Sequence, residues 1–190
     1  MHASEEALLG TRAVERRRVS FALGRAAARD ALADLGVAAV AIGRGPAGEP
    51  IWPMNIVGAI SHAGDVGIAL AGRASDYAGL GVDVEELSRG MSARAARLVC
   101  RPGEMDWVDV ESGSERLTMV FSAKEAVFKA VYPLERVWLG FGDAELTWRA
   151  ERGLFEARLL KSPGVRLPVD SVLEVYCTIT GGLVLSTTYC

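Results

Sequence analysis

The chain of 190 residues contains few side chains that bind zinc or form disulfides. Its three cysteines, Cys100, Cys177 and Cys190, show no CxxC spacing, and an odd number does not suit a closed disulfide framework. We therefore expect free thiols in a reducing compartment. His62 is the single internal histidine, so histidines alone cannot form a zinc site here.

Long hydrophobic runs and an excess of positive charge are also missing. No stretch approaches the roughly 18 apolar residues that a membrane-spanning helix requires. The early charges Glu5, Glu6 and Arg12 do not fit the apolar core of a secretory signal. A formal net charge of −3 argues against a protein that coats nucleic acid. We expect a cytoplasmic protein with neither a membrane nor a nucleic-acid partner.

Half of the residues are hydrophobic, which is enough for a substantial core in one domain or in two small halves. The first half begins with a predicted helix over Val14–Leu35, where an apolar stripe repeats every seven residues and Gly36 serves as the C-cap. Short apolar runs between Gly/Pro-rich turns then predict three strands, Val37–Ile42, Ile56–Ile60 and Val66–Ala71.

The second half repeats this layout of a long helix and several strands. We predict helices over Ser92–Val99, Gly103–Val110 and Glu115–Tyr132, the last one ended by Pro133. The predicted strands are Tyr77–Glu85, Ala144–Arg149, Leu154–Leu160, Leu173–Ile179 and Leu183–Thr188, with Gly181-Gly182 as a hairpin turn. The expected fold is α+β with two similar lobes, residues 1–78 and 79–190, and a ligand cleft between them.

Two carboxylates stand in the apolar strand motif Gly81-Val82-Asp83-Val84-Glu85. Alternate strand residues share a face, so Asp83 and Glu85 would lie about 6.6–6.8 Å apart with their charges repelling each other. A cation between them would relieve the repulsion, and hard oxygen ligands suit Mg²⁺ or Mn²⁺. The alternative is a strand end that runs into solvent with Glu86 as a third surface acid.

An acid and two bases lie together in the helix motif Phe121-Ser122-Ala123-Lys124-Glu125-Ala126-Val127-Phe128-Lys129-Ala130. Glu125 and Lys129 could simply form an exposed i, i+4 pair. Lys124, however, falls on the apolar stripe, where a lysine must extend to the surface or meet an anion. A site that binds both a metal and phosphates needs this combination of charges.

The remaining candidate residues lie in the first half. His62 follows Ser61 at a strand-to-turn junction, where it is either a capped turn residue or a group that donates a hydrogen bond to a phosphate or transfers a proton. Arg25 lies at the edge of the buried stripe of the first helix, a position that suits bidentate phosphate binding. Arg44, in a glycine-rich loop, could add a contact or be surface charge.

The order and spacing of these motifs resemble the Sfp/EntD-type 4′-phosphopantetheinyl transferases, most closely the branch that includes the enterobactin-synthase transferases. The resemblance covers roughly Val14–Tyr132 and also uses Gly48-Glu49-Pro50-Ile51-Trp52-Pro53 and Ile60-Ser61-His62. Its most specific parts are the GVDVE and KEAVFKA blocks. It implies a pseudo-symmetric monomer, each lobe a small antiparallel sheet packed on a long helix, with coenzyme A bound between the lobes.

The resemblance also implies roles for individual residues. It implies that Mg²⁺, or alternatively Mn²⁺, is bound by three acids, Asp83, Glu85 and Glu125. It implies a catalytic group of Glu125 as the base, Lys129 and His62. The residues implied to bind coenzyme A are Arg17, Arg25, Arg44, Ser61, His62, Lys124 and Lys129.

The implied reaction transfers phosphopantetheine from coenzyme A to a serine of an acyl or peptidyl carrier protein and releases 3′,5′-ADP. Such enzymes serve secondary-metabolite and siderophore biosynthesis. Met91–Asp109, with its arginines and apolar residues, is the expected docking segment for the carrier. Glu49 departs from the family, because some relatives place a lysine there. Two alternatives use the same residues, a metal-dependent phosphodiesterase of coenzyme A or nucleotides and a non-catalytic coenzyme A-binding protein.

Overall fold

The computed structural model describes residues 2–10, 13–38, 40–108 and 114–190. The first half contains two helices, one 3₁₀ turn and four strands. In chain order these are α1 (Ala3–Glu6), η1 (Ala7–Leu9), α2 (Glu15–Asp34), β1 (Gly43–Arg44), β2 (Pro50–Ile51), β3 (Ile56–Ala63) and β4 (Val66–Arg73). Strands β3 and β4 form an antiparallel hairpin that pairs from Ile56↔Arg73 to Ala63↔Val66.

The second half contains a larger sheet and the longest helix. Its elements are β5 (Leu80–Glu86), η2 (Leu87–Arg89), α3 (Ala93–Val99), α4 (Pro102–Met105), α5 (Ser114–Glu135), η3 (Phe141–Asp143), β6 (Ala144–Arg149), β7 (Leu154–Leu159), β8 (Val172–Thr180) and β9 (Leu183–Tyr189). The five strands are antiparallel in the order β5-β9-β8-β7-β6. The expected α+β fold with small antiparallel sheets is therefore confirmed.

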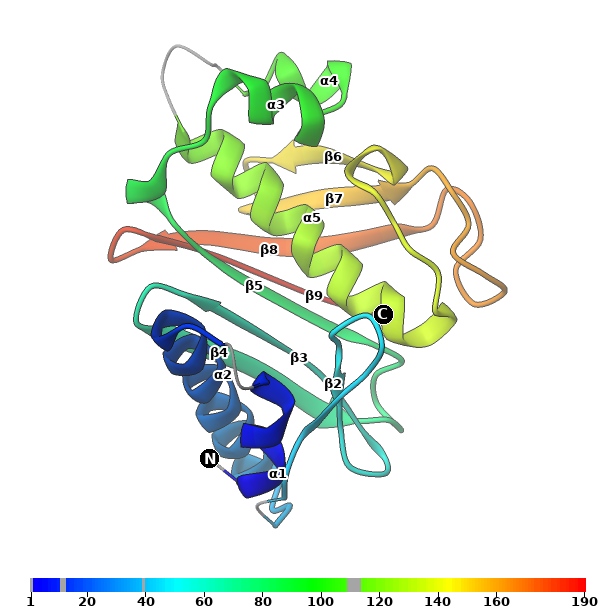
Figure 1. The fold of residues 1–190 in the computed structure, drawn as a ribbon. Coiled ribbons are helices and arrows are strands. Elements are labelled where there is room, and N and C mark those ends of the chain that lie inside the picture. Colours follow the sequence, from blue (N-terminus) through cyan, green and yellow to red (C-terminus); the bar gives the residue numbers. More distant parts are fainter. Residues whose placement is uncertain (1, 11–12, 39, 109–113) are drawn as a thin grey trace.

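Each long helix covers one sheet (Figure 1). Helix α2 packs on the β3–β4 hairpin, and α5 runs across the larger sheet from β6 to β5. Strand β5, at one edge of the larger sheet, lies beside β3 of the hairpin, so the two halves meet along these strands. A large core between α5 and the sheet includes Val120, Val127 and Phe155, whereas a smaller core below α2 includes Leu32 and Ile42.

The expected end of helix α2 is confirmed. Gly36 has φ +70°, a conformation that glycine adopts at low cost. The Val37 N–H bonds to the Leu32 carbonyl at 2.9 Å, and the Gly36 N–H bonds to the Ala33 carbonyl at 2.8 Å. This pair of bonds is a Schellman motif, which satisfies the last carbonyls of the helix.

The strand predicted at Val37–Ile42 is wrong, since the described residues of this segment lie in no strand. The backbone N–H groups at both ends of the segment already donate hydrogen bonds to groups outside it. The Val37 N–H closes helix α2, and the Ile42 N–H donates to the Glu5 carboxylate at 3.0 Å. The short strand β1 therefore starts only at Gly43.

Two helix boundaries also differ from the prediction. Pro133 does not end α5, because the Arg136 N–H bonds to the Tyr132 carbonyl at 2.8 Å and closes one more turn after the proline. Helix α4 is only four residues long, and Val110, the predicted end of that segment, lies outside the described residues. The expected hairpin turn at Gly181-Gly182 is confirmed, with φ +57° and +77°.

Glycines let helix α5 approach strand β5 closely. A Cβ at Gly81 would overlap the carbonyl oxygen of Ala126, and a Cβ at Gly79 would overlap that of Ala130. Because side chains alternate along a strand, Asp83 and Glu85 share the face of Gly79 and Gly81. The closest part of the helix–sheet contact thus lies directly beside the two carboxylates of the sequence motif.

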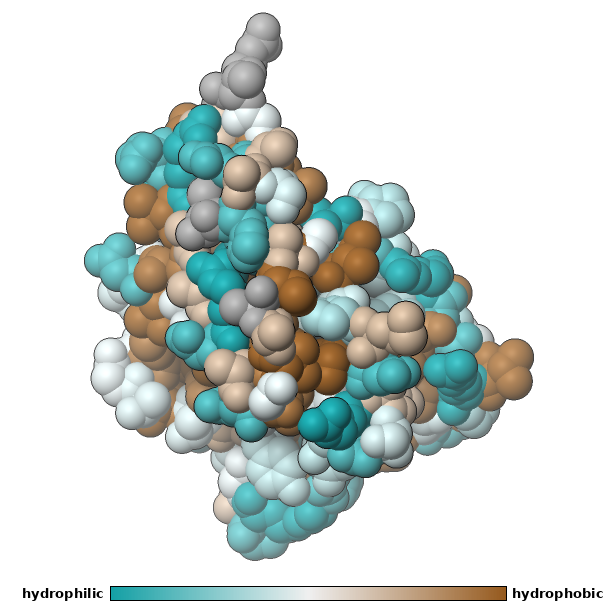
Figure 2. Space-filling view, turned by 90° about the horizontal axis from the view of Figure 1, so that it is seen from below, coloured by the Kyte–Doolittle hydropathy of each residue, from teal (hydrophilic) through white to brown (hydrophobic). Residues whose placement is uncertain are grey.

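The surface mixes polar and apolar residues. Figure 2 views the molecule from below, where hydrophilic and hydrophobic residues are interspersed across the face. Large exposed hydrophobic side chains occur on separate elements, including Val14 before α2, Leu98 on α3 and Trp138 after α5. Among the described residues, no helix combines the length and the hydropathy needed to cross a membrane.

Replacing Gly81 with alanine is expected to destabilise the protein by about 1–3 kcal/mol, because the added methyl group pushes α5 away from β5. Urea unfolding followed by tryptophan fluorescence measures this change. Gly103→Ala is the matched control, since the first atom that its Cβ meets is 4.0 Å away. Equal unfolding midpoints for Gly81→Ala and the unsubstituted protein would contradict the proposed close contact.

Candidate active site

Asp83 lies at the centre of a hydrogen-bonded cluster between the two halves. The side chain is buried, with 2% of its surface exposed. Its Oδ1 accepts hydrogen bonds from Lys129 Nζ at 2.6 Å and from Ser61 Oγ at 2.9 Å, and Lys129 Nζ also reaches Ser61 Oγ at 3.0 Å. Ser61 comes from β3, Asp83 from β5 and Lys129 from α5. The structure therefore brings these three predicted residues together.

Glu125 lies next to this cluster on α5, one turn before Lys129. Burial raises the pKa of Glu125 above its ordinary value, the nearby Asp83 charge raises it further, and Lys129 opposes both. A carboxylate with a raised pKa accepts a proton more readily near neutral pH. The predicted base is therefore beside Asp83 in a setting that favours proton transfer.

The acids fit a cation only in part. Asp83 Oδ2 is buried and has no hydrogen-bond partner among the described residues, which is costly unless a ligand satisfies it. The charge of Asp83 acts on Glu125 as a repulsion between like charges, which a cation held by both carboxylates would relieve. Within the described ranges, however, no group of three His, Cys, Asp or Glu side chains is arranged to hold a metal ion. Glu85, the third predicted ligand, is half-buried and makes an interaction of its own.

A second group of predicted residues lines a basic pocket of about 170 Å³ between α2, the β1–β2 loop and β3. Its polar and charged lining residues are Arg17, Ser20, Arg25, Arg44 and His62. The sequence places these residues on three separate elements, α2, β1 and β3, and the fold gathers them at one cavity. A pocket that collects three arginines and a histidine suits an anionic ligand.

Arg25 is the most deeply buried cation of the basic pocket, with 5% of its surface exposed. Its Nη2 donates to the Gly43 carbonyl at 3.1 Å, and its guanidinium carbon lies 4.5 Å from the centre of the Phe21 ring. Its Nε is buried and has no partner among the described residues. An anion that reached this donor would satisfy it.

His62 lines the basic pocket and interacts electrostatically with Lys129 and Asp83 of the Asp83 cluster. Burial and the neighbouring Lys129 charge lower its pKa below the ordinary value. The imidazole is therefore mainly neutral at pH 7 and can donate a hydrogen bond from one ring nitrogen.

Two further cavities extend the basic pocket along α5. One of about 170 Å³ shares Gly48, Pro50 and Ile60 with the basic pocket and is also lined by Lys129. The next, of about 160 Å³, shares Phe128 with it and lies against Glu125. The last cavity is mainly apolar, with Trp138, Leu139 and Phe141 in its wall. Because neighbouring cavities share lining residues, the three lie in a row from the arginines to Glu125.

Glu49, the residue that departs from the family pattern, lies at the edge of the middle cavity. Its carboxylate accepts the Ala47 N–H at 3.0 Å and pairs with Arg136, directly after α5. The loop before β2 is therefore tied to the second half by an ion pair.

Lys124 lies outside the Asp83 cluster. Its ammonium group donates to Glu104 Oε2 at 2.7 Å, to the Val99 carbonyl at 2.8 Å and to the Phe141 carbonyl at 2.8 Å. All three of its hydrogens are thus used within the protein. Burial lowers its pKa, although Glu104 opposes the change. The sequence offered two alternatives for a lysine on the apolar stripe, and the structure shows the one in which it meets an anion, Glu104. In this arrangement Lys124 has no hydrogen left for a phosphate.

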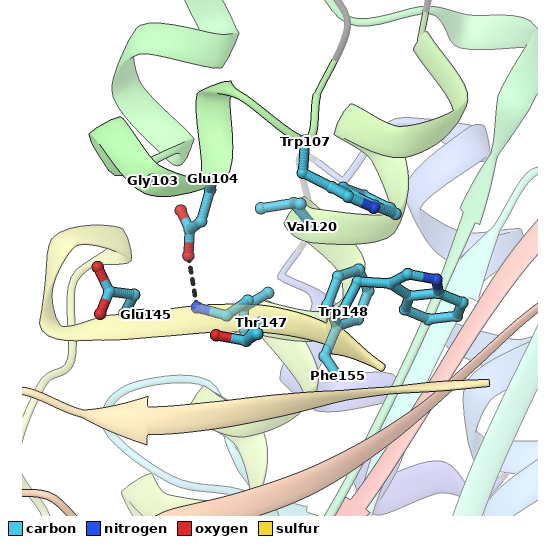
Figure 3. A pocket seen from close by; sticks show the side chains of 9 residues that line it. Gly103, Glu104, Trp107, Val120, Glu145, Thr147, Trp148 and Phe155 are labelled. Atoms are coloured by element: carbon cyan, nitrogen blue, oxygen red, sulfur yellow. Dashed lines mark hydrogen bonds between the residues drawn. The ribbon is translucent and has the colours of Figure 1, made fainter. Parts of the chain in front are cut away.

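Glu104 lies at the wall of a separate cavity of about 220 Å³ between α4 and β6 (Figure 3). Besides Lys124, it accepts the Leu146 N–H at 2.7 Å and the Arg101 N–H at 2.6 Å. Figure 3 shows Glu104 and Glu145 on one side of the cavity and the rings of Trp107, Trp148 and Phe155 on the other. None of the predicted site residues lines this cavity.

Comparison with known families matches both halves of the chain. Residues 4–72 match the model of the 4′-phosphopantetheinyl transferase N-terminal domain. Residues 79–175, just over half of the chain, match the model of the 4′-phosphopantetheinyl transferase superfamily. The chain belongs to the 4′-phosphopantetheinyl transferase family.

Individual members of this family cover most of the chain. The transferase Npt of Nocardia iowensis is 37% identical over 80% of this chain and 68% of its own length. The transferase Svp of Streptomyces mobaraensis is 40% identical over 82% of this chain and 65% of its own length. Enterobactin synthase component D of Salmonella typhi is 35% identical over 70% of this chain and 55% of its own length. The chain spans about two thirds of the length of the first two relatives.

Two buried acids of this chain were not among the residues predicted from the sequence. Glu104 follows Arg101-Pro102-Gly103, and a proline at the first helical position with a glutamate at the third is a helix-start signal that could have marked it. Glu5 resembles its exposed neighbour Glu6 in the sequence. Glu5 accepts the His2 N–H three residues away, but its other two partners, Arg29 and Ile42, are 24 and 37 residues away, so no local signal shows that it is buried.

Replacing Lys124 with methionine is expected to lower the free energy of unfolding by about 3–5 kcal/mol, because Glu104 would stay buried without its ammonium partner. The double variant Lys124→Met/Glu104→Gln should recover part of this loss, since it removes the unpaired charge. Urea unfolding at pH 7 measures both.

The matched control is the exposed ion pair of Arg152 and Glu174, where Arg152→Met should cost less than about 1 kcal/mol. A Lys124→Met protein as stable as the control variant would show that the buried pair contributes little to the fold.

Proposed function

We propose that this chain transfers the 4′-phosphopantetheine arm of coenzyme A to a serine of an acyl or peptidyl carrier protein and releases 3′,5′-ADP. The observation that carries the proposal is the Asp83–Lys129–Ser61 cluster beside Glu125, at the end of a path that starts in an arginine pocket. Coenzyme A has a matching order of groups. It carries a phosphorylated nucleoside at one end, a pyrophosphate in the middle and a long pantetheine arm.

The arginine pocket is the proposed site of the 3′-phosphoadenosine end. Arg17, Arg25 and Arg44 supply three positive charges there, and Arg25 Nε is a buried donor without a partner among the described residues. Bidentate guanidinium donors match phosphate geometry. His62 lines the basic pocket, and this pocket adjoins the cavity of Lys129 at Gly48, Pro50 and Ile60. The pyrophosphate would therefore lie between His62 and Lys129 with Ser61 close by.

The apolar cavity beside Glu125 is the proposed site of the pantetheine arm. Trp138, Leu139 and Phe141 form a wall that suits a long, weakly polar chain. Glu125 would then lie where the arm joins the pyrophosphate. Lys124 borders the same cavity, and through its bond to the Phe141 carbonyl it would fix this wall and make no contact with a phosphate.

Glu125 is the proposed base. Its raised pKa suits it to take the proton from the serine hydroxyl of the carrier, whose oxygen then attacks the phosphorus that bears pantetheine. Lys129 and His62 would neutralise or bond to the phosphate oxygens as 3′,5′-ADP leaves. The chemistry is phosphoryl transfer, in which positioning and charge neutralisation supply most of the rate enhancement.

The proposed cofactor is Mg²⁺, with Mn²⁺ as an alternative. Asp83 and Glu125 would hold it, Asp83 through the Oδ2 that has no partner among the described residues, and Glu85 remains the predicted third ligand. Hard carboxylate oxygens suit either cation. When bound, such a cation withdraws charge from the phosphate oxygens and so stabilises the transition state.

Helix α3 is the proposed docking surface for the carrier protein, within the segment Met91–Asp109 expected from the sequence. Arg94 and Arg97 are exposed, and Leu98 is 71% exposed. The helix lies next to the turn of α5 that carries Glu125, because the Val99 carbonyl accepts a hydrogen bond from Lys124, the neighbour of Glu125. A basic helix with an exposed apolar residue suits an acidic carrier.

Some residues of the proposed docking segment are not available to contact a carrier. Val99 is buried and cannot reach a partner, and Arg101 is already bonded to the Gly142 carbonyl at 2.7 Å. Asp109 lies outside the described residues. The proposed contact surface therefore consists of the exposed residues of α3.

We also propose that the protein acts in the cytoplasm as a monomer, with residues 1–78 as the coenzyme A-binding lobe and 79–190 as the lobe of the metal and the carrier. Its three free cysteines are consistent with a reducing compartment. The separate cores below α2 and α5 support the division into lobes.

Intact-protein mass spectrometry tests the proposed function. An apo carrier protein incubated with this protein, coenzyme A and Mg²⁺ should gain the mass of one phosphopantetheine group. EDTA and the variant Glu125→Ala should each abolish the gain. Glu115→Ala, an exposed acid on the same helix, is the control and should leave the gain unchanged.

No mass gain on acyl and peptidyl carriers would contradict the transfer proposal. Release of 3′,5′-ADP from coenzyme A without a carrier would indicate a phosphodiesterase, and binding of coenzyme A without any turnover would indicate a non-catalytic binding protein.

The same assay tests the docking surface. Replacing Arg94 and Arg97 together by glutamate should raise the KM for the carrier about tenfold or more, because like charges would then face each other. The KM for coenzyme A should stay the same. Equal changes in both KM values would show that the two arginines act on the fold and not on the carrier.

A further inference from the structure

Glu5 is a fully buried charged residue that the proposed reaction does not use. Its Oε1 accepts the Ile42 N–H at 3.0 Å. Its Oε2 accepts the His2 N–H at 2.9 Å and Arg29 Nη1 at 3.0 Å. Burial raises the pKa of this carboxyl, but the hydrogen bonds and the charges of Arg29 and Arg25 outweigh burial and hold the pKa below its ordinary value.

The contacts of Glu5 lead to the basic pocket by two routes. Ile42, which it binds, is fully buried and directly precedes Gly43, whose carbonyl accepts Arg25 Nη2 at 3.1 Å. Arg29, which it also binds, lies one turn after Arg25 on the same face of α2. The carboxylate is therefore attached to both elements that determine where Arg25 points, the helix that carries it and the strand that accepts its hydrogen bond.

Arg25 needs such support because it makes few bonds of its own. Among the described residues its guanidinium bonds to the Gly43 carbonyl, while its Nε remains unpaired at the pocket. A shift of Gly43 would turn the whole planar group. Because a guanidinium binds phosphate through a fixed fork of N–H groups, even a small rotation would lose one of two parallel bonds.

We infer that Glu5 is a positioning residue for recognition of the 3′-phosphate of coenzyme A. It fixes Ile42 and Gly43, so that Arg25 directs its free N–H groups into the basic pocket. Glu5 itself touches no ligand, and it does not line the pocket. The inference rests on the proposed binding of coenzyme A. It adds that Glu5 contributes to the selectivity for coenzyme A over the same molecule without its 3′-phosphate.

The test compares coenzyme A with dephospho-coenzyme A, which lacks only the 3′-phosphate, as phosphopantetheine donors. In Glu5→Gln the KM for coenzyme A should rise about tenfold, the effect of losing one charge-assisted hydrogen bond. The KM for dephospho-coenzyme A and both kcat values should change less than about twofold. Glu6→Gln, the exposed neighbour on α1, is the matched control and should behave as the unsubstituted protein.

A second variant separates positioning from simple charge. Glu5→Asp keeps the negative charge but is one methylene shorter, so its carboxylate cannot reach Ile42 and Arg29 together. We expect it to lose the selectivity for coenzyme A as well, and being the milder change it also serves if Glu5→Gln does not fold. Thermal unfolding of each variant shows which of them are folded at the assay temperature.

Two outcomes would overturn the inference. One is an unchanged ratio of the two KM values in the folded variants. The other is tighter use of coenzyme A by Glu5→Gln, which would mean that the carboxylate repels the ligand.

If the proposed function is wrong, the unsubstituted protein will transfer phosphopantetheine from neither donor, which distinguishes this case from a wrong role for Glu5. In that case calorimetric binding of 3′,5′-ADP against 5′-AMP tests the same selectivity without turnover. Equal affinities for these two nucleotides in the unsubstituted protein would also refute the inference.

Discussion

The proposed active site depends on the close approach of helix α5 to strand β5. This approach is sterically allowed because Gly79 and Gly81 present no side chain to the carbonyl groups of Ala130 and Ala126. In this arrangement Lys129 Nζ donates to both Asp83 Oδ1 and Ser61 Oγ. A wider spacing would move Glu125 and Lys129, both on α5, away from Asp83 on β5. It would also loosen the junction of the two halves, since Ser61 belongs to the other half.

Buried acids stabilise the surroundings of the site at both ends of the proposed coenzyme A path. Glu5 ties α1 and α2 to the segment before β1, and Glu104 ties α4 and β6 to Lys124 on α5. Both carboxylates are fully bonded, which offsets the cost of burying charge. Asp83 differs, because one of its oxygens has no partner among the described residues. This difference in hydrogen bonding is expected if Glu5 and Glu104 stabilise the fold and Asp83 binds a ligand.

The family resemblance implied that Asp83, Ser61 and Lys129, from three separate elements, belong to one site. Local patterns in the sequence predicted both long helices and most strands, because alternation in a strand and the helical repeat fix which side chains share a face. They did not predict features that depend on distant partners. The segment Val37–Ile42 has the composition of a strand, but Glu5 and the end of α2 occupy its backbone groups. Lys124 was correctly predicted to be an unusual lysine on a buried stripe, yet its partner Glu104 is 20 residues away and is brought to it only by folding.

A crystal structure of the protein with coenzyme A and Mg²⁺ is the most direct test of this arrangement. We expect the 3′-phosphate at Arg25, the pyrophosphate between His62 and Lys129, and the cation at Asp83 Oδ2 and Glu125. The pantetheine arm should follow the cavity wall of Trp138 and Phe141. Coenzyme A bound away from the arginine pocket, or bound there with its pyrophosphate turned away from Lys129, would contradict the proposed site.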